Sequence, residues 1–250
     1  MLRSFWGKLF QWNGLFGFVL ILLFGIPRFI IVLQANQTGN YCYVSIIFII
    51  MWIAPFVLLT REGRSFIGMK KPGNYRWLFI SLFTGAAACS VMFGIAELCF
   101  GNSVNNWFVY ISKSYSVVDL IRNATSEQTQ AYFLIYALAG MTFSPIGEEL
   151  LYRGLIHGSF ATQLGEKQAS LVDSLAFSLT HLAHFGIVYL SGVWTFLPLP
   201  GVLWVLLMLG TSLLFFFCKE KTGSLLGAIF CHAGFNLAMT YFIFYHILNR

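Results

Sequence analysis

Long apolar runs separated by short polar stretches follow one another along the whole chain. Seven of these runs are close to, or longer than, the roughly 20 residues that a helix needs to cross the hydrocarbon core of a bilayer. They are 14–34, 42–60, 77–100, 131–157, 171–191, 201–218 and 224–247. No alternation of period two persists, and an open sheet edge cannot lie in lipid, so no strands are expected. The pattern predicts an all-α, polytopic membrane bundle of about seven transmembrane helices.

Composition supports a membrane protein, because 58% of the residues are hydrophobic and only 10% are charged. Soluble domains carry about a quarter charged residues. A disordered chain, a coiled coil, a secreted disulfide scaffold and a nucleic-acid-binding protein are therefore excluded. The net charge of +6 fits basic cytoplasmic loops better than nucleic-acid binding. We expect membrane lipid and a peptide or protein as the partners.

The distribution of Lys and Arg predicts the orientation. Most of them, including a cluster at Arg61, Arg64, Lys70 and Lys71, fall in loops on the same side as the N-terminus. The N-terminus is therefore expected in the cytoplasm, and the absence of secretory signals favours a bacterial cytoplasmic membrane. The polar loop 101–130 then lies outside, as a short surface helix or a lid. We divide the chain into an unassigned part, 1–130, and a chemical core, 131–250.

Ionisable and amide side chains are concentrated in three of the predicted spans. A charge at the bilayer centre costs at least about 2.5 kcal/mol, so such groups are functional candidates. Their sequence distances from the cytoplasmic ends of the spans place Glu148, His181 and His232 about 12 to 15 Å deep, at 1.5 Å per residue. Three helices with polar groups at one depth predict a common site. The candidates are Glu148, Glu149, Arg153, His181, His232 and Asn236.

Helical spacing separates the roles of the two glutamates. Glu149 and Arg153 are four residues apart, so they are expected to pair along one face of the helix. This pair is either part of the site or only a buried structural ion pair. Glu148 points about 100° away, without a charged partner in its own span, and an unpaired glutamate in an apolar bundle suits a general base. Pro145 and Gly147 are expected to bend the helix and admit water.

Other polar residues have two interpretations each. His184 either binds a metal together with His181 or bonds to nearby backbone, and His157 is either solvated or a gate residue near the interface. Asp173 either lines a substrate entrance or is a plain interfacial aspartate. Arg28 and Glu97, in spans one and three, both fall toward the outer leaflet, and we expect them to pair.

The three motifs together resemble a known family. They are Glu148-Glu149-x-x-x-Arg153, Phe177-x-x-x-His181 and His232-x-x-x-Asn236, each in its own predicted membrane helix. In this order they are similar to the CPBP family, the CAAX-protease and bacteriocin-processing (Abi) intramembrane endopeptidases. The resemblance covers about 140–240.

The resemblance implies hydrolysis of peptide bonds of lipidated or membrane-associated substrates. Glu148 would activate a water held by His181, while His232 and Asn236 would stabilise the oxyanion. Members have been described both as metalloproteases and as metal-free enzymes. A metal-free mechanism is favoured here, since no HExxH motif is present, but Glu148, His181 and His232 remain the zinc set if zinc is used. A proton-coupled transporter and a catalytically inactive scaffold or immunity factor are the alternative functions.

Overall fold

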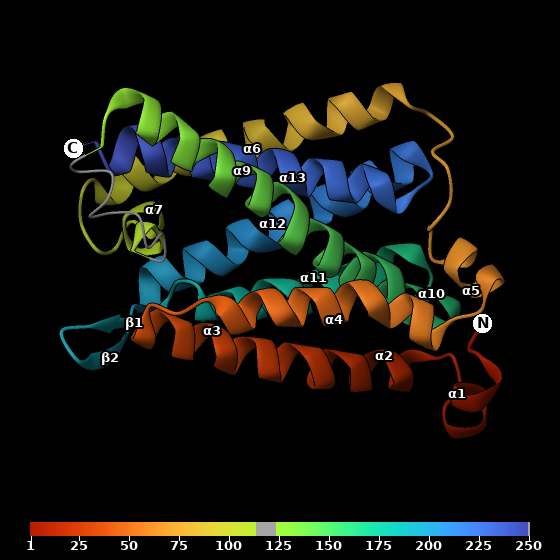
Figure 1. Cartoon of the computed structure of the whole chain (residues 1–250). Helices are drawn as coiled ribbons and strands as arrows, with labels where there is room; N and C mark the ends of the chain where they lie inside the picture. The colour runs from red at the N-terminus through yellow and green to blue at the C-terminus, as the bar shows by residue number, and fades with distance from the viewer. Residues whose placement is uncertain (114–123, 250) are drawn as a thin grey trace.

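The computed structural model describes residues 1–113 and 124–249. These residues form a bundle of helices with one short hairpin (Figure 1). The elements are α1 (Ser4–Leu9), α2 (Gly14–Leu20), α3 (Ile26–Thr38), α4 (Cys42–Leu58), α5 (Arg61–Phe66), α6 (Arg76–Phe100), α7 (Trp107–Ser112), α9 (Ser126–Glu149), α10 (His157–Leu164), α11 (Glu166–Thr180), β1 (Ile187–Leu190), β2 (Val193–Phe196), α12 (Pro198–Thr222) and α13 (Leu225–Phe242). Stretches of π-helix cover Ile21–Gly25, Leu150–Ile156 and Ile243–Ile247, and a 3₁₀ turn covers His181–Ala183.

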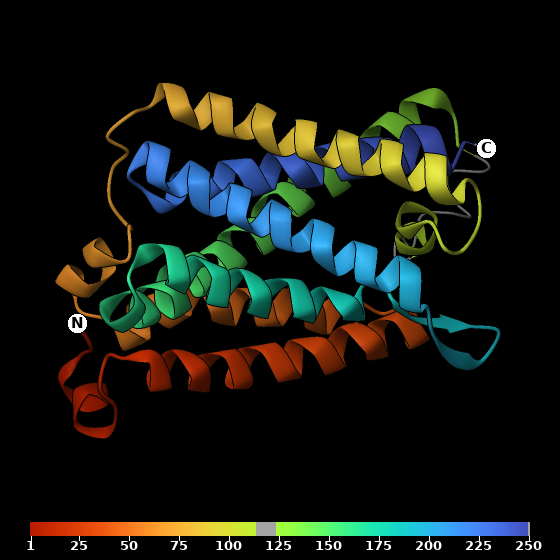
Figure 2. The same cartoon turned by 180° about the vertical axis from the view of Figure 1, so that it is seen from behind.

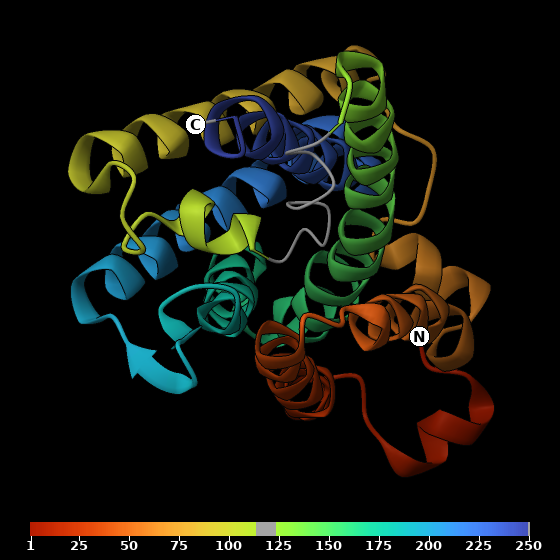
Figure 3. The same ribbon diagram turned by 60° about the vertical axis from the view of Figure 1, so that its left-hand side comes forward.

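The long helices form two groups that are joined by α9. On one side α6 packs against α13, and on the other side α3 packs against α4 (Figures 1 and 3). Helix α9 crosses the bundle obliquely and contacts both α13 and α4. Helix α12 packs against α13 and α11, which closes the opposite side (Figure 2). The predicted helical bundle is therefore confirmed.

Among the described residues, four helical segments are long and apolar enough to cross a membrane. They are Gly14–Thr38, Arg76–Phe100, Pro198–Thr222 and Leu225–Ile247, and α4 is a shorter apolar helix. All five overlap predicted spans. Helix α11, by contrast, has only 15 residues, and α9 carries the polar residues of the first motif. An integral membrane protein is supported, while the number of seven spans and the side of the N-terminus stay predictions.

The expectation of an all-helical span over 171–191 is wrong. Helix α11 ends at Thr180, and β1 pairs with β2 in an antiparallel hairpin in which Ile187 lies opposite Phe196. Ser191 and Gly192 both have positive φ angles, the conformation that a tight two-residue hairpin turn requires. The sequence did not reveal this hairpin, because a short apolar run with β-branched and aromatic residues is compatible with a buried strand and with a buried helix.

Polar side chains define where several helices begin. The Thr125 hydroxyl accepts the backbone N–H of Gln128, and the Gln128 side chain accepts that of Thr125, so α9 starts with a complete capping box. The Ser224 side chain accepts the N–H of Leu226 at the start of α13. Within 101–130, helix α7 is present but its Trp107 is buried, not on the surface, and residues 114–123 of this loop lie outside the described residues.

Two glycines allow α6 and α13 to approach closely. A Cβ placed on Gly85 would overlap the carbonyl oxygen of Cys231, and one on Gly234 would overlap the carbonyl oxygen of Leu82. In lipid, where apolar burial does not drive association, such close backbone packing is a main source of helix–helix affinity. The crossing matters for function because it determines where His232 lies.

Gly85→Val should therefore destabilise the protein by about 1–3 kcal/mol, the usual cost of overpacking a close contact. Gly94→Val is the matched control, since it lies in the same helix and a Cβ there meets nothing within 4 Å. Thermal unfolding in detergent measures both variants. Equal losses of stability at the two positions would contradict the proposed contact.

Candidate active site

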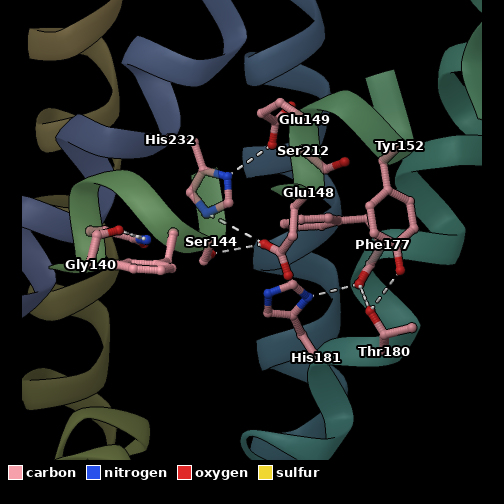
Figure 4. Close-up of polar contacts among 12 residues, drawn as sticks. Gly140, Ser144, Glu148, Glu149, Tyr152, Phe177, Thr180, His181, Ser212 and His232 are labelled. Atoms are coloured by element: carbon pink, nitrogen blue, oxygen red, sulfur yellow. Dashed lines mark hydrogen bonds and ion pairs between the residues drawn. The ribbon is translucent and has the colours of Figure 1, made fainter. Parts of the chain in front are cut away.

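Residues of the three motifs meet where α9, α11 and α13 approach one another inside the bundle. Glu148 lies in the last turn of α9, His181 follows the end of α11, and His232 lies on α13. All three side chains are almost entirely buried. Figure 4 shows the Glu148 carboxylate between the imidazole rings of His181 and His232. The expectation that the three helices bring these groups together is confirmed as geometry.

Glu148 makes polar contacts with each of its carboxylate oxygens. Its Oε2 accepts a hydrogen bond from the Ser144 hydroxyl at 3.1 Å and lies 3.6 Å from Nε2 of His232 (Figure 4). Its Oε1 forms an ion pair with the guanidinium of Arg28 on α3. The expectation of an unpaired Glu148 is therefore wrong, because the partner comes from a different helix.

The expectation that Arg28 pairs with Glu97 is wrong. Glu97 accepts a hydrogen bond from Asn106 at 2.8 Å, near the start of α7. Arg28 instead faces the site, where Nη1 donates to the Thr180 hydroxyl at 2.8 Å and Nη2 lies 3.3 Å from Nε2 of His184. The two charges that appeared to share a depth thus belong to separate clusters.

Glu149 orients His232. Its Oε1 lies 2.8 Å from Nδ1 of His232, and its two oxygens lie 3.3 and 3.2 Å from Nη1 and Nε of Arg153. A carboxylate that accepts the Nδ1–H of an imidazole holds the ring and selects its tautomer. Nε2 of His232 then faces Glu148. The predicted pair Glu149–Arg153 is confirmed, and it is connected to the site through His232.

Arg153 is buried among aromatic rings and polar partners. Its guanidinium carbon lies 4.3 Å from the ring centre of Phe177 and 5.4 Å from that of Phe215. The guanidinium also donates to the backbone and side chain of Ser212 and lies 3.7 Å from Asp173. Such planar contacts favour Arg over Lys. Phe215 also stacks on His232, with the ring centres 4.6 Å apart.

The His181 ring is oriented by two aromatic residues. Its Nδ1 lies 2.8 Å from the carbonyl oxygen of Phe177, and the Phe177 ring centre lies 4.2 Å from its own. Trp204 donates to the carbonyl oxygen of His181 at 2.9 Å. A neutral imidazole that donates from Nδ1 has an acceptor at Nε2. His181 is thus suited to accept a hydrogen from a water molecule.

Asn236 lies one helical turn from His232 and reaches the same cavity. Its amide Nδ2 donates to the carbonyl oxygen of Gly140 at 2.9 Å. A primary amide has two N–H donors, so one remains for a ligand. Asn236 contacts neither glutamate directly and forms the part of the cavity wall farther along α13.

A cavity of about 370 Å³ opens beside these residues. Most of its wall is apolar or aromatic, and its polar side chains include Arg28, Ser144, His181, His232 and Asn236. Ser144 and His232 are also the residues that contact Glu148 Oε2. An apolar chain of a ligand therefore has space next to the polar cluster.

A second polar cluster lies at the junction of α10 and α11. His157 is buried and makes two contacts, from Nδ1 to Asp173 at 2.8 Å and from Nε2 to Glu166 at 2.7 Å. Asp173 is also buried. The interpretation of His157 as solvated is therefore wrong, while its interpretation as a gate residue and both interpretations of Asp173 stay predictions. Asp173 also lies 3.7 Å from Nε of Arg153, so this cluster is connected to the Glu149–Arg153 pair.

The polar side chains of the site contact one another and two guanidinium groups. Glu148 and Glu149 each already face a guanidinium group, His184 lies beside Arg28, and Nδ1 of His181 contacts the Phe177 carbonyl. Within 1–113 and 124–249, no group of three or more His, Cys, Asp or Glu side chains is arranged to hold a metal. The set Glu148, His181 and His232 stays the zinc set that the sequence predicts if zinc is used.

The sequence alone missed two residues that contact the candidate base, Arg28 and Ser144. Ser144 was within reach of a sequence argument, because it precedes Glu148 by four residues and so lies on the same helical face. For Arg28 the signal was its charge inside an apolar span, which marks a functional candidate. Its partner was not evident because pairing across helices depends on how the helices are rotated.

Comparison with protein families gives one result for this part of the chain. Residues 130–238 match the model of the type II CAAX prenyl endopeptidase Rce1-like family. All three motifs fall inside the matched range, so the family resemblance in the motifs is confirmed. Comparisons with curated proteins and with solved structures found no match.

Proposed function

We propose that this chain is an intramembrane endopeptidase, because residues 130–238 match the model of the type II CAAX prenyl endopeptidase Rce1-like family. Its substrate would be a membrane-associated or lipidated peptide or protein. The observation that carries this proposal is the convergence of Glu148 with two imidazoles beside an apolar cavity. Amide hydrolysis needs an activated water and donors directed at the developing charge, and this cluster supplies both.

Each residue of the site has a separate role in the proposed reaction. Glu148 takes a proton from a water whose second hydrogen is accepted by Nε2 of His181. The resulting hydroxide adds to the scissile carbonyl carbon, and the carbonyl electrons move to the oxygen. For His232 to stabilise this oxyanion, its ring must carry a hydrogen on Nε2 as well as on Nδ1. This Nε2–H and the second N–H of Asn236 then donate to the oxyanion. As the C–N bond breaks, Glu148 returns the proton to the leaving amine.

Glu149 and Arg153 act through His232. Glu149 accepts the Nδ1–H of the ring, and Arg153, which packs against the rings of Phe177 and Phe215, pairs with Glu149. We assign both as positioning residues, since neither contacts the site of the reacting carbonyl. Their buried network keeps His232 in one orientation, which oxyanion stabilisation requires.

The proposed mechanism uses no metal ion. It is supported by the guanidinium groups of Arg28 and Arg153, which place positive charge beside the two carboxylates. Cleavage of a quenched lipidated peptide by purified protein in detergent should therefore be unchanged by a chelator. The control is addition of zinc after chelation. Loss of activity with chelator and recovery with zinc would contradict the metal-free mechanism.

The apolar cavity favours a substrate with a hydrophobic chain near the cleaved bond. A panel of one peptide with a prenyl group, the same peptide without it and a transmembrane peptide tests this directly. We expect the lipidated peptide to be cleaved with the highest kcat/KM. Preference for the transmembrane peptide would point to another class of membrane substrate.

A further inference from the structure

The candidate base is contacted by a residue outside the matched family segment. Arg28 lies on α3, more than 100 residues before position 130, where the Rce1-like match begins. Its side chain is 1% exposed and lines the cavity together with Ser144 and His232. The N-terminal part of the chain, to which the sequence assigned no role, therefore supplies a charge at the centre of the site.

Local structure explains how Arg28 reaches the site. Gly25 lies three residues earlier, and a Cβ there would already touch the side chain of Thr180 at 3.4 Å, so α3 passes close to the end of α11. The π-helical stretch Ile21–Gly25 precedes Arg28 and changes the rotation of the residues that follow it. Such stretches are common at functional sites. Together these features direct Arg28 inward.

The contacts of Arg28 determine the orientation of the Glu148 carboxylate. Nη2 pairs with Oε1 and Nη1 is anchored on Thr180, which itself donates to the carbonyl oxygen of Phe177. With Oε1 held, Oε2 is left to face Ser144 and His232. Oε2 is therefore the oxygen on the side of the cavity wall, where a water would be activated.

We propose that Arg28 is a positioning residue for the general base. The inference rests on the proposed function and extends the site to a helix outside the family match. Arg28 holds one oxygen of the Glu148 carboxylate, so that the other is directed at the water. The charge is essential to this role, because a buried carboxylate without a cation is strongly disfavoured.

Substitution combined with chemical rescue tests the role. Arg28→Ala should lower kcat for the lipidated peptide by about 100-fold, the cost of a misplaced catalytic group, with little change in KM. Added guanidinium should restore part of kcat by entering the space that the side chain leaves, while urea, which has similar shape and no charge, should not. Arg28→Lys should retain more activity than Arg28→Ala. Arg64→Ala, which removes a half-buried arginine far from the site, is the matched control.

The results separate this inference from the proposed function. Full activity of Arg28→Ala, or equal rescue by urea and guanidinium, would overturn the positioning role while leaving the protease intact. If the wild-type protein cleaves no peptide, the proposed function fails. Thermal unfolding then tests the ion pair between Arg28 and Glu148 independently of activity. In that measurement Arg28→Ala combined with Glu148→Gln should be more stable than Arg28→Ala alone. If the double variant instead lost the sum of the stabilities lost by the two single variants, the ion pair would be contradicted.

Discussion

Glu148→Gln should lower kcat/KM by about 10²–10⁴-fold, the contribution of a positioned general base. The amide has nearly the same shape as the carboxylate, and it still accepts from Ser144 at one oxygen. A neutral amide is not a base at this position, so it cannot take a proton from water. The measurement is the initial rate of cleavage of a quenched lipidated peptide by purified protein in detergent.

Two controls make this result specific. Glu166→Gln changes an exposed glutamate that contacts His157 outside the cavity, and it should retain nearly full activity. Thermal unfolding of Glu148→Gln should show a folded protein of lower stability, because the amide keeps the packing but leaves the buried Arg28 guanidinium without its carboxylate. If Glu148→Gln retained more than a tenth of the wild-type activity, another residue would have to be the base.

Arg153→Met should have the largest effect on stability, a loss of about 3–5 kcal/mol, as for other broken buried ion pairs. The change leaves Glu149 without its guanidinium and removes the guanidinium that lies 3.7 Å from Asp173. Methionine fills much of the space between Phe177 and Phe215, so the loss reports mainly charge. Thermal or denaturant unfolding in detergent measures it.

The matched comparison for this prediction is Arg64→Met. Arg64 also lies over an aromatic ring, that of Phe56, but its guanidinium bonds only a backbone carbonyl at a half-buried position. Its replacement should cost less than about 1 kcal/mol. Arg153→Lys should recover only part of the stability, because an ammonium group does not stack on rings. Equal stability of Arg153→Met and wild type would contradict the proposed network.

The sequence predicted the parts of the site that depend on helix identity and depth. Glu148, His181 and His232 lie at similar distances along their spans, and polar residues deep in apolar helices gather to satisfy one another. The pair of Glu149 and Arg153 followed from a spacing of four residues. These arguments need only the rise and period of a helix.

Features that depend on rotation and on contacts between distant segments were not predictable. Arg28 faces Glu148 because of a π-helical stretch and a close approach at Gly25. The pattern of hydrophobic residues along the chain reveals neither feature. The burial of His157 depends on two carboxylates from α11. The hairpin after α11 depends on backbone angles at Ser191 and Gly192, in a segment as apolar as a helix.

The central claim is that this buried cluster hydrolyses a peptide bond with an activated water. Mass spectrometry of a lipidated peptide incubated in ¹⁸O-labelled water tests it most directly. We predict that wild-type protein yields two products, with one labelled oxygen in the new carboxylate, and that Glu148→Gln and His181→Ala yield neither. Absence of cleavage by the wild-type protein, or equal product from Glu148→Gln, would contradict the claim.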